Sequence, residues 1–138
     1  MVRIYPDSRG RTVDIQYLAR RAADALADKK GLDVILLDVS PLTVIADTFV
    51  LATGTSRTHV QTLAESVGRK LTEIGRKRIR EEGRTEGEWV LLDFGDLLVH
   101  IFQAKTRDYY SLERLWGDAA RIEWEPAVSG AERPSSTI

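Results

Sequence analysis

Residues 88–116 constrain the fold of this chain more than any other part of the sequence. Two apolar runs, at residues 89–92 and 97–102, flank a four-residue connection that contains Gly95. Apolar runs separated by a short glycine-containing connection are typical of a β-hairpin. An amphipathic, aromatic-rich segment follows and predicts a helix at about residues 108–116. The chain must therefore accommodate an antiparallel strand pair that leads into a helix.

Two further helices are predicted upstream, where apolar residues recur at helical spacing. The first covers about residues 12–30, with Thr12 as its N-cap, Asp14 in its first turn and Gly31 in the left-handed position beyond its end. The second begins after Thr55 or Ser56, either of which can cap it. The two apolar stripes consist of Ile15, Leu18, Ala22, Ala25 and Leu26, and of Val60, Leu63, Ala64, Val67, Leu71 and Ile74.

Strand signals lie between and after these helices. Residues 32–39 form a nearly continuous apolar run, typical of a strand covered on both faces, and residues 48–53 form a second strand. The segment 42–47 between them is ambiguous, and we expect a short helical turn there. Residues 77–82 predict a polar edge strand whose charges discourage edge-to-edge aggregation. The order predicts an α/β fold with one mixed sheet of about five strands flanked by helices.

The length of 138 residues is that of a single domain. We expect a flexible N-terminus at residues 1–11, a folded domain at 12–117, and a disordered tail at 118–138, which is rich in Pro, Ser and Gly. The chain has no cysteine and no apolar secretory signal at its start, which favours a cytoplasmic location. No apolar run approaches the roughly 20 residues that a membrane helix needs.

The net charge of −1 argues against strong nonspecific binding of nucleic acid, but the charge is distributed unevenly. Residues 69–80 carry six Lys and Arg against one Glu, and residues 81–96 carry six Asp and Glu against one Arg. One interpretation is that the two segments are solvated faces or neutralise each other. The other is an acidic patch that steers a basic partner into contact.

The turn at Gly54-Thr55-Ser56-Arg57, between a strand and a helix, is the first candidate site. Its backbone N–H groups could hold a phosphate at the helix N-terminus, or its residues could simply turn the chain and cap the helix. A strand, such a turn and a helix also begin the nucleotidyltransferase pattern. That reaction needs a D-x-D pair on a following strand to hold magnesium, and none occurs after the turn.

Histidine offers little for catalysis. There are only two, His59 in the first turn of a predicted helix and His100 inside an apolar strand. A single strand histidine is more often a buried packing residue than a base. We therefore expect no catalytic residue, no metal site and no cofactor.

The aromatic residues and acids of residues 88–116 are the remaining candidates. Trp89, with the nearby carboxylates, has the composition of a protein interface, although a core position is the alternative. The rings and acids concerned are Trp89, Tyr109, Tyr110 and Trp116, with Asp93, Asp96 and Glu113.

Several sequence blocks resemble the Iojap family, the ribosomal silencing factors, in order and spacing over about residues 12–117. They are Leu37-Asp38-Val39, residues 46–57 (ADTFVLATGTSR), residues 88–96 (EWVLLDFGD), Val99-His100-Ile101-Phe102 and residues 110–116 (YSLERLW). The resemblance implies a fold related to nucleotidyltransferases but without their activity, and a tendency to form homodimers.

The resemblance also implies a function. Such a protein binds the large ribosomal subunit, through a ribosomal protein on the face that joins the small subunit, and thereby represses translation when nutrients are short. It would act by steric occlusion, without membrane binding or direct reading of nucleic acid. We expect the docking residues to be Trp89, Asp93, Asp96, Tyr109, Tyr110 and Glu113. The competing hypothesis is a nucleotidyltransferase-like enzyme that binds a nucleotide at Gly54-Thr55-Ser56.

Overall fold

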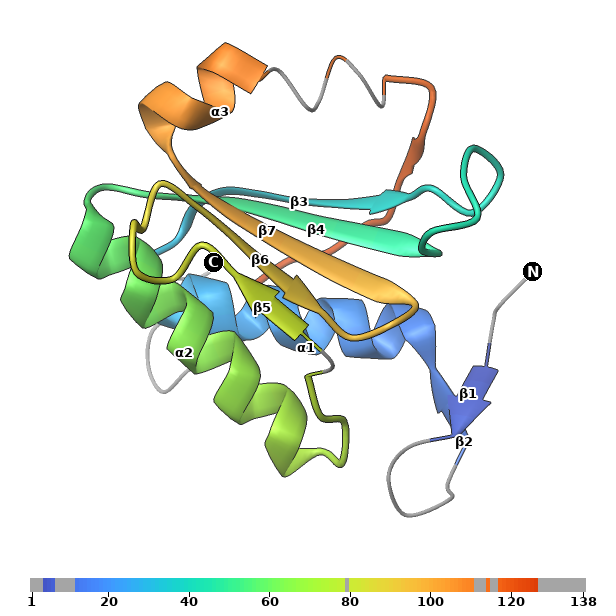
Figure 1. The fold of residues 1–138 in the computed structure, drawn as a ribbon. Coiled ribbons are helices and arrows are strands. Elements are labelled where there is room, and N and C mark those ends of the chain that lie inside the picture. The colour runs from blue at the N-terminus through green and yellow to red at the C-terminus, as the bar shows by residue number, and fades with distance from the viewer. Residues whose placement is uncertain (1–3, 7–11, 79, 111–113, 115–116, 127–138) are drawn as a thin grey trace, which may run out of the picture.

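A six-stranded sheet organises the chain (Figure 1). The computed structural model describes residues 4–6, 12–78, 80–110, 114 and 117–126. In the sheet order β5-β6-β7-β4-β3-β8, only β4 and β7 run parallel, so the predicted mixed sheet is confirmed. The strands are β3 (Leu32–Asp38), β4 (Thr48–Gly54), β5 (Arg80–Glu82), β6 (Trp89–Asp93), β7 (Leu97–Gln103) and β8 (Ala120–Arg121).

The predicted hairpin is confirmed as β6 and β7, which pair antiparallel with Leu91 opposite His100. Its turn closes where the backbone N–H of Phe94 donates to the carbonyl oxygen of Leu97 at 2.9 Å. Gly95 has a φ of +96°, a left-handed conformation that costs glycine little because it has no Cβ. The short connection read from the sequence therefore has the chemistry that this turn requires.

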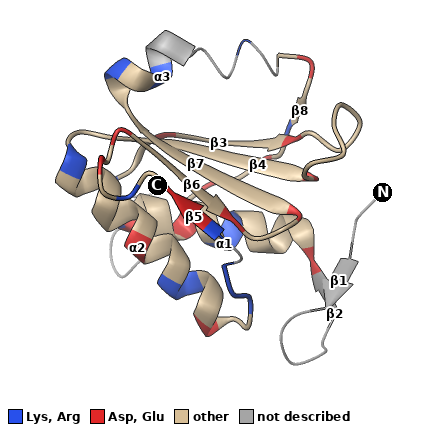
Figure 2. Ribbon diagram, in the orientation of Figure 1, with Lys and Arg blue, Asp and Glu red and all other residues tan. Residues whose placement is uncertain are grey.

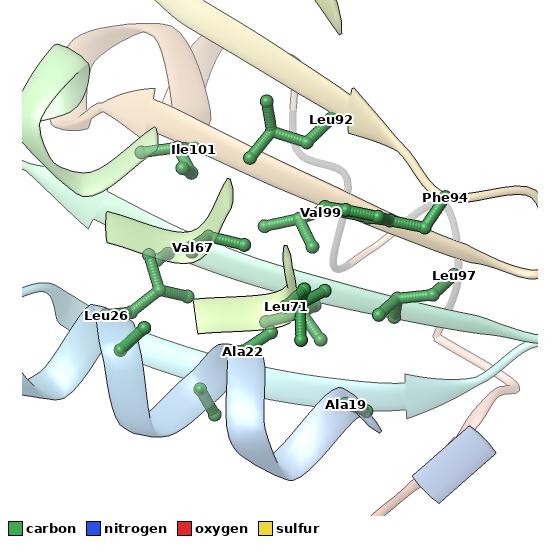
Figure 3. Close-up of a cluster of buried hydrophobic side chains, with 14 of the residues drawn as sticks. Ala19, Ala22, Leu26, Val67, Leu71, Leu92, Phe94, Leu97, Val99 and Ile101 are labelled. Atoms are coloured by element: carbon green, nitrogen blue, oxygen red, sulfur yellow. The ribbon is translucent and has the colours of Figure 1, made fainter. Parts of the chain in front are cut away.

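Helices α1 (Ile15–Asp28) and α2 (Arg57–Glu73) lie side by side against one face of the sheet (Figure 1). Their apolar stripes meet alternate residues of the central strands in the main core, shown in Figure 3. Leu26 and Leu71 are fully buried there, between the helices and the strands. Burying one such side chain contributes about 1.5–3 kcal/mol, so this layer supplies most of the hydrophobic stabilisation of the fold.

The ends of α1 differ from the prediction. Its N-cap is Asp14, not Thr12, because the Asp14 side chain accepts a hydrogen bond from the backbone N–H of Gln16 at 2.9 Å. A carboxylate satisfies an otherwise unpaired N–H group and also faces the positive end of the helix dipole. At the other end, Lys30, not Gly31, has the left-handed conformation, with a φ of +66°.

Two predicted helical segments are displaced along the chain. A single turn forms at residues 39–43, where the N–H groups of Leu42 and Thr43 both donate to the Val39 carbonyl, and no helix forms at 44–47. The last helix, α3, begins earlier than predicted and spans Ala104–Tyr110. Residues 111–113, 115 and 116 of the predicted helix lie outside the described residues. The predicted edge strand is confirmed over the shorter range of β5.

Residues 120–124 belong to the tail that we predict from residue 118, and in the structure they contact the sheet and α1. The tail from residue 127 onward lies outside the described residues. Strand β8 pairs with the end of β3, and the N–H group of Ile122 donates to the Leu36 carbonyl at 2.9 Å. The indole Nε1 of Trp124 donates to a carboxylate oxygen of Asp24 on α1 at 2.9 Å. These contacts give the sheet its sixth strand and close its β3 edge against the helix layer.

Of the N-terminal segment 1–11, which we predict to be flexible, the structure describes residues 4–6. Residues Ile4–Pro6 form β1, which pairs antiparallel with β2 (Thr12–Asp14) in a separate two-stranded sheet. Strand β2 runs directly into α1, so the helix begins where this small sheet ends. Among the described residues, no helix has the length and apolar character to cross a bilayer.

Candidate functional site

The face of the sheet opposite α1 and α2 carries a second cluster of apolar side chains, which we call the outer cluster. Along β6, Val90 and Leu92 point to the helices, whereas Trp89, Leu91 and Asp93 point to the other face and are half-buried. Helix α3 lies over one end of this face (Figure 1). The outer cluster consists of buried Leu37, Val39, Ala46, Phe49, Leu51, Leu98 and Phe102, with partly buried Ile35, Trp89, Leu91 and Ala119.

The ring of Trp89 is held against this face by two neighbours on β7. Its indole Nε1 donates to Nδ1 of His100 at 3.2 Å. Its ring lies 5.1 Å from the Phe102 ring, at an interplanar angle of 35°. An aromatic pair of this geometry adds about 0.5–1.5 kcal/mol beyond its buried area. Trp89, the docking residue that we predict from sequence, therefore has its ring fixed by contacts within this chain.

His100 is confirmed as a buried residue, with 7% of its surface exposed. Burial lowers the pKa of His100 to about 4, because an apolar setting disfavours the charged imidazolium. The neutral ring accepts the Trp89 N–H at Nδ1, which assigns its own proton to Nε2. This histidine orients Trp89 and has no geometry suited to base catalysis.

Asp93 closes the hairpin turn. One carboxylate oxygen accepts from the N–H of Gly95 at 2.8 Å, and the other lies 3.2 Å from an Nη atom of Arg80 on β5. The first contact is an Asx-type turn, which stabilises a tight reversal of the chain. Both oxygens of Asp93 thus have partners inside the protein.

Asp96 is more deeply engaged. Its carboxylate forms an ion pair with Arg76 at 2.7 Å, and only 9% of its side chain is exposed. Its backbone carbonyl accepts from the N–H groups of Asp47 and Thr48 at 2.9 and 3.2 Å. This geometry suits Asp96 to hold the hairpin turn against the start of β4, rather than to reach across to a partner.

The structure does not describe the side chains of the other three docking candidates. Tyr109 and Tyr110 close helix α3, but their side chains lie outside the described part of the structure. Glu113 lies wholly outside the described residues. Their part in docking stays a prediction.

The two charged segments largely neutralise each other, which favours the first of the two interpretations of the charge pattern. Around β5, acidic and basic residues lie side by side (Figure 2). Hydrogen bonds to Glu81 raise the pKa of Arg84, and bonds to Arg84 and Arg69 lower that of Glu65. Among the described residues, the ion pairs of this region include Arg69–Glu65, Arg76–Asp96, Arg78–Glu81, Arg80–Glu82, Arg80–Asp93, Arg84–Glu81 and Arg84–Glu65.

The turn after β4 is satisfied by its own contacts. Ser56 caps α2 by accepting from the N–H of His59 at 3.0 Å, and the N–H of Thr55 donates to His59 Nδ1 at 2.8 Å. The Nε2 of His59 donates in turn to the Lys29 carbonyl at the end of α1. A Cβ on Gly54 would lie 2.8 Å from a Val60 methyl carbon, so the glycine permits close packing of strand and helix. These roles are structural, and they leave the turn poorly suited to hold a phosphate.

Among the described residues, no group of three or more His, Cys, Asp or Glu side chains could hold a metal ion.

The family model described as "Ribosomal silencing factor during starvation" matches residues 12–137. The chain belongs to this family.

Relatives and a solved structure agree with this ribosomal silencing factor assignment. A ribosomal silencing factor of Chromobacterium violaceum is 42% identical, over 91% of this chain and 100% of that protein. One of Halalkalibacterium halodurans is 40% identical, over 83% of this chain and 97% of that protein. A crystal structure of a Chromobacterium violaceum protein has a TM-score of 0.73 at 40% identity, covering 90% of this chain and 92% of that one.

Membership of the family decides between the two functional hypotheses. Ribosomal silencing factors are non-enzymatic ribosome-binding proteins whose fold resembles that of nucleotidyltransferases. The competing hypothesis, a nucleotidyltransferase-like enzyme that binds a nucleotide at the turn after β4, is therefore wrong. Family membership also implies binding to the large ribosomal subunit.

Sequence reasoning missed the pairing of Trp89 with His100. The two residues lie on neighbouring strands, diagonally across the ladder, where Trp89 faces Phe102 and Leu91 faces His100. Diagonal neighbours of this kind are within reach of long aromatic side chains. The hairpin register, counted outward from Gly95, is the signal that would have found them.

Proposed function

We propose that this chain docks on a ribosomal protein at the subunit-joining face of the large ribosomal subunit, and so blocks attachment of the small subunit. The observation that carries the proposal is family membership over residues 12–137. The geometry of the hairpin supports it. Trp89 lies half-buried on the sheet face that α1 and α2 leave uncovered, and is already fixed by its neighbours. A fixed aromatic side chain loses little conformational entropy on binding, which favours affinity.

The docking surface that we propose centres on Trp89 and Leu91, with Asp93 and Asp96 at its turn. The two carboxylates act chiefly by holding the turn in place, because each already binds an arginine of this chain. Tyr109, Tyr110 and Glu113 extend the surface toward the segment after α3. Contacts with Lys or Arg of the partner would then come from the rim of the surface, where charge guides encounter more than it adds affinity.

The mechanism is steric occlusion, and it consumes no nucleotide and needs no metal. A protein that covers part of the joining face prevents assembly for as long as it stays bound. Silencing then depends on a slow dissociation rate, which is the quantity that interface contacts mostly set. We propose that the factor acts in this way in the cytoplasm when nutrients are scarce, and that it forms homodimers when free.

The proposal is tested by mixing purified large and small subunits and following their association by light scattering. Preincubation of the large subunits with this protein should lower the final scattering in proportion to its concentration. Sedimentation through a sucrose gradient should show the protein with free large subunits and not with joined ribosomes. No change in scattering at large molar excess would overturn the proposal.

The docking surface is tested separately with Trp89→Ala. We expect it to weaken binding to large subunits about 30-fold or more, because central aromatic residues of interfaces cost at least about 2 kcal/mol when truncated. Trp124→Ala is the matched control, since it removes an equally large, half-buried ring that faces α1 instead. Equal binding by both variants, with circular dichroism showing both folded, would place the anchor elsewhere.

A further inference from the structure

Helix α3 is attached to the sheet by a charged side chain. Among the side chains of α3 that the structure describes, only that of Arg107 is buried, with 6% of its surface exposed. Arginine is rarely buried this deeply unless its guanidinium group has partners. A helix of seven residues has little stability of its own, so the position of α3 depends on its contacts with the sheet.

The guanidinium group of Arg107 joins α3 to two strands at an irregularity of the sheet. Its Nη1 atom donates to the backbone carbonyl of Asp33 on β3 at 2.9 Å and to the hydroxyl group of Thr53 on β4 at 2.8 Å. The register of β3 against β4 shifts between Leu32 and Ile35, and Asp33 within this bulge has a φ of +50°. A bulge interrupts the ladder of backbone hydrogen bonds. Arg107 therefore binds a carbonyl group that lies at the interruption.

The contact of Arg107 lies in the same row of residues as Trp89. Thr53 is in register with Phe102 on β7, and Phe102 is in register with Trp89 on β6. Thr53 also shares the face of Leu51, a member of the outer cluster, because the two are two residues apart on one strand. Helix α3 starts at Ala104, directly after β7, and lies over this end of the sheet (Figure 1). The Arg107 guanidinium thus enters the face on which Trp89 lies, with Phe102 between them.

The two bonds of Arg107 also fix how α3 is rotated about its axis. A guanidinium group is planar and donates in fixed directions, so its two acceptors determine its orientation. In an α-helix, two positions along the chain correspond to about 200° around the axis. Tyr109 follows Arg107 by two positions, so its Cα atom lies on the side of α3 that faces away from the bulge. Arg107 therefore sets where this docking candidate is placed relative to Trp89.

We propose that Arg107 is a positioning residue of the docking surface: by binding Asp33 and Thr53, it holds α3 beside Trp89 so that the large ribosomal subunit contacts both. The inference rests on the proposed function and deepens it. Arg107 itself is buried and reaches no partner. Without it, α3 has to be ordered during binding, and the entropy lost in that step reduces the affinity.

The test measures binding of the full chain, labelled with a fluorophore at its N-terminus, to purified large subunits by fluorescence anisotropy, at a temperature where circular dichroism shows every variant folded. Arg107→Met should bind about tenfold more weakly. Leu71→Ala is the matched control, because it destabilises the fold from the other face of the sheet and should bind like the unmodified chain. Equal weakening by both variants would mean that Arg107 acts only through stability, and would overturn the inference. If Arg107→Met does not fold, Thr53→Val removes one of the two acceptors and should bind about threefold more weakly; unchanged binding by it would overturn the inference.

A double-mutant cycle separates positioning from a merely structural role. Tyr109→Ala should weaken binding of the unmodified chain, and it should weaken binding of Arg107→Met much less, because the helix that carries the tyrosine is then no longer held in place. Equal losses in the two backgrounds, or none in either, would overturn the inference. If the unmodified chain itself fails to bind large subunits, the proposed function fails together with this inference. Normal binding by Arg107→Met, in a chain that does bind, sinks the inference alone.

Discussion

The buried His100 should make the stability of this protein fall steeply between neutral and mildly acidic pH. In the unfolded chain a histidine binds a proton near pH 6.5, whereas in the folded protein His100 does so only near pH 4. Between these values the unfolded state holds more protons, so the free energy of unfolding decreases as the pH falls. The stabilisation is present in full above about pH 6.5 and is lost as the pH drops toward about 4.

The magnitude follows from the difference in pKa. About 2.5 units at about 1.4 kcal/mol per unit give a total of roughly 3.4 kcal/mol. Of this, about 2 kcal/mol is lost between pH 7 and pH 5, because the unfolded histidine is almost fully protonated at the lower value. Only 7% of His100 is exposed, so solvent screening does not reduce this figure much.

Urea unfolding of the unmodified chain and of His100→Gln, at pH 7 and at pH 5, measures the effect. Other groups titrate in this range too, but they are common to both proteins and cancel in the comparison. The glutamine variant should lose about 2 kcal/mol less on acidification. His100→Leu should behave in the same way although it cannot accept the Trp89 hydrogen bond, which separates protonation from that bond. Equal losses in the unmodified chain and in both variants would refute the reasoning.

Three further substitutions test the framework around the site, each by urea unfolding followed by circular dichroism. Arg76→Ala should lower the free energy of unfolding by about 3 kcal/mol, because it leaves the largely buried Asp96 carboxylate without its cation. A loss below about 1 kcal/mol would mean that water solvates the ion pair. Ser56→Ala should cost about 1 kcal/mol by removing the cap of α2; equal stability would show that the His59 N–H finds another acceptor. Leu71→Ala should cost about 2–5 kcal/mol by opening a cavity between α2 and the sheet, and a smaller loss would mean that the layer closes around it.

The central elements could be predicted from sequence because each carries a strong local pattern. The hairpin has two long apolar runs and a glycine that needs a positive φ. The stripe of α2 follows a helical period over four turns, and β4 is buried along its whole length. These hydrophobic patterns arise because the elements are buried in the core, and for such elements the period of the pattern indicates whether the segment is a helix or a strand.

What could not be predicted depends on contacts between distant parts of the chain. Strand β8 is only two residues long, both of them exposed, and it exists because Leu37 and Asp38 offer a free strand edge. Trp124 reaches Asp24 on α1, a hundred positions earlier in the chain, and nothing local signals that bond. The sequence predicts that Asp93 and Asp96 bind a partner, because their sequence neighbours do not reveal that Arg80 and Arg76 lie beside them in space. Composition alone does not separate acids that hold a turn from acids that meet a partner.

The parallel contact between β4 and β7 has a consequence for the synthesis of this protein. It joins residue 48 to residue 97 and residue 54 to residue 103, so the middle of the sheet cannot close until the second half of the chain has been made. Until then β4, which is buried throughout in the finished protein, offers an open apolar edge to any passing strand. A chain stalled or truncated before residue 97 should therefore aggregate into inclusion bodies. A protein that silences ribosomes thus depends on complete translation of its own chain in order to fold.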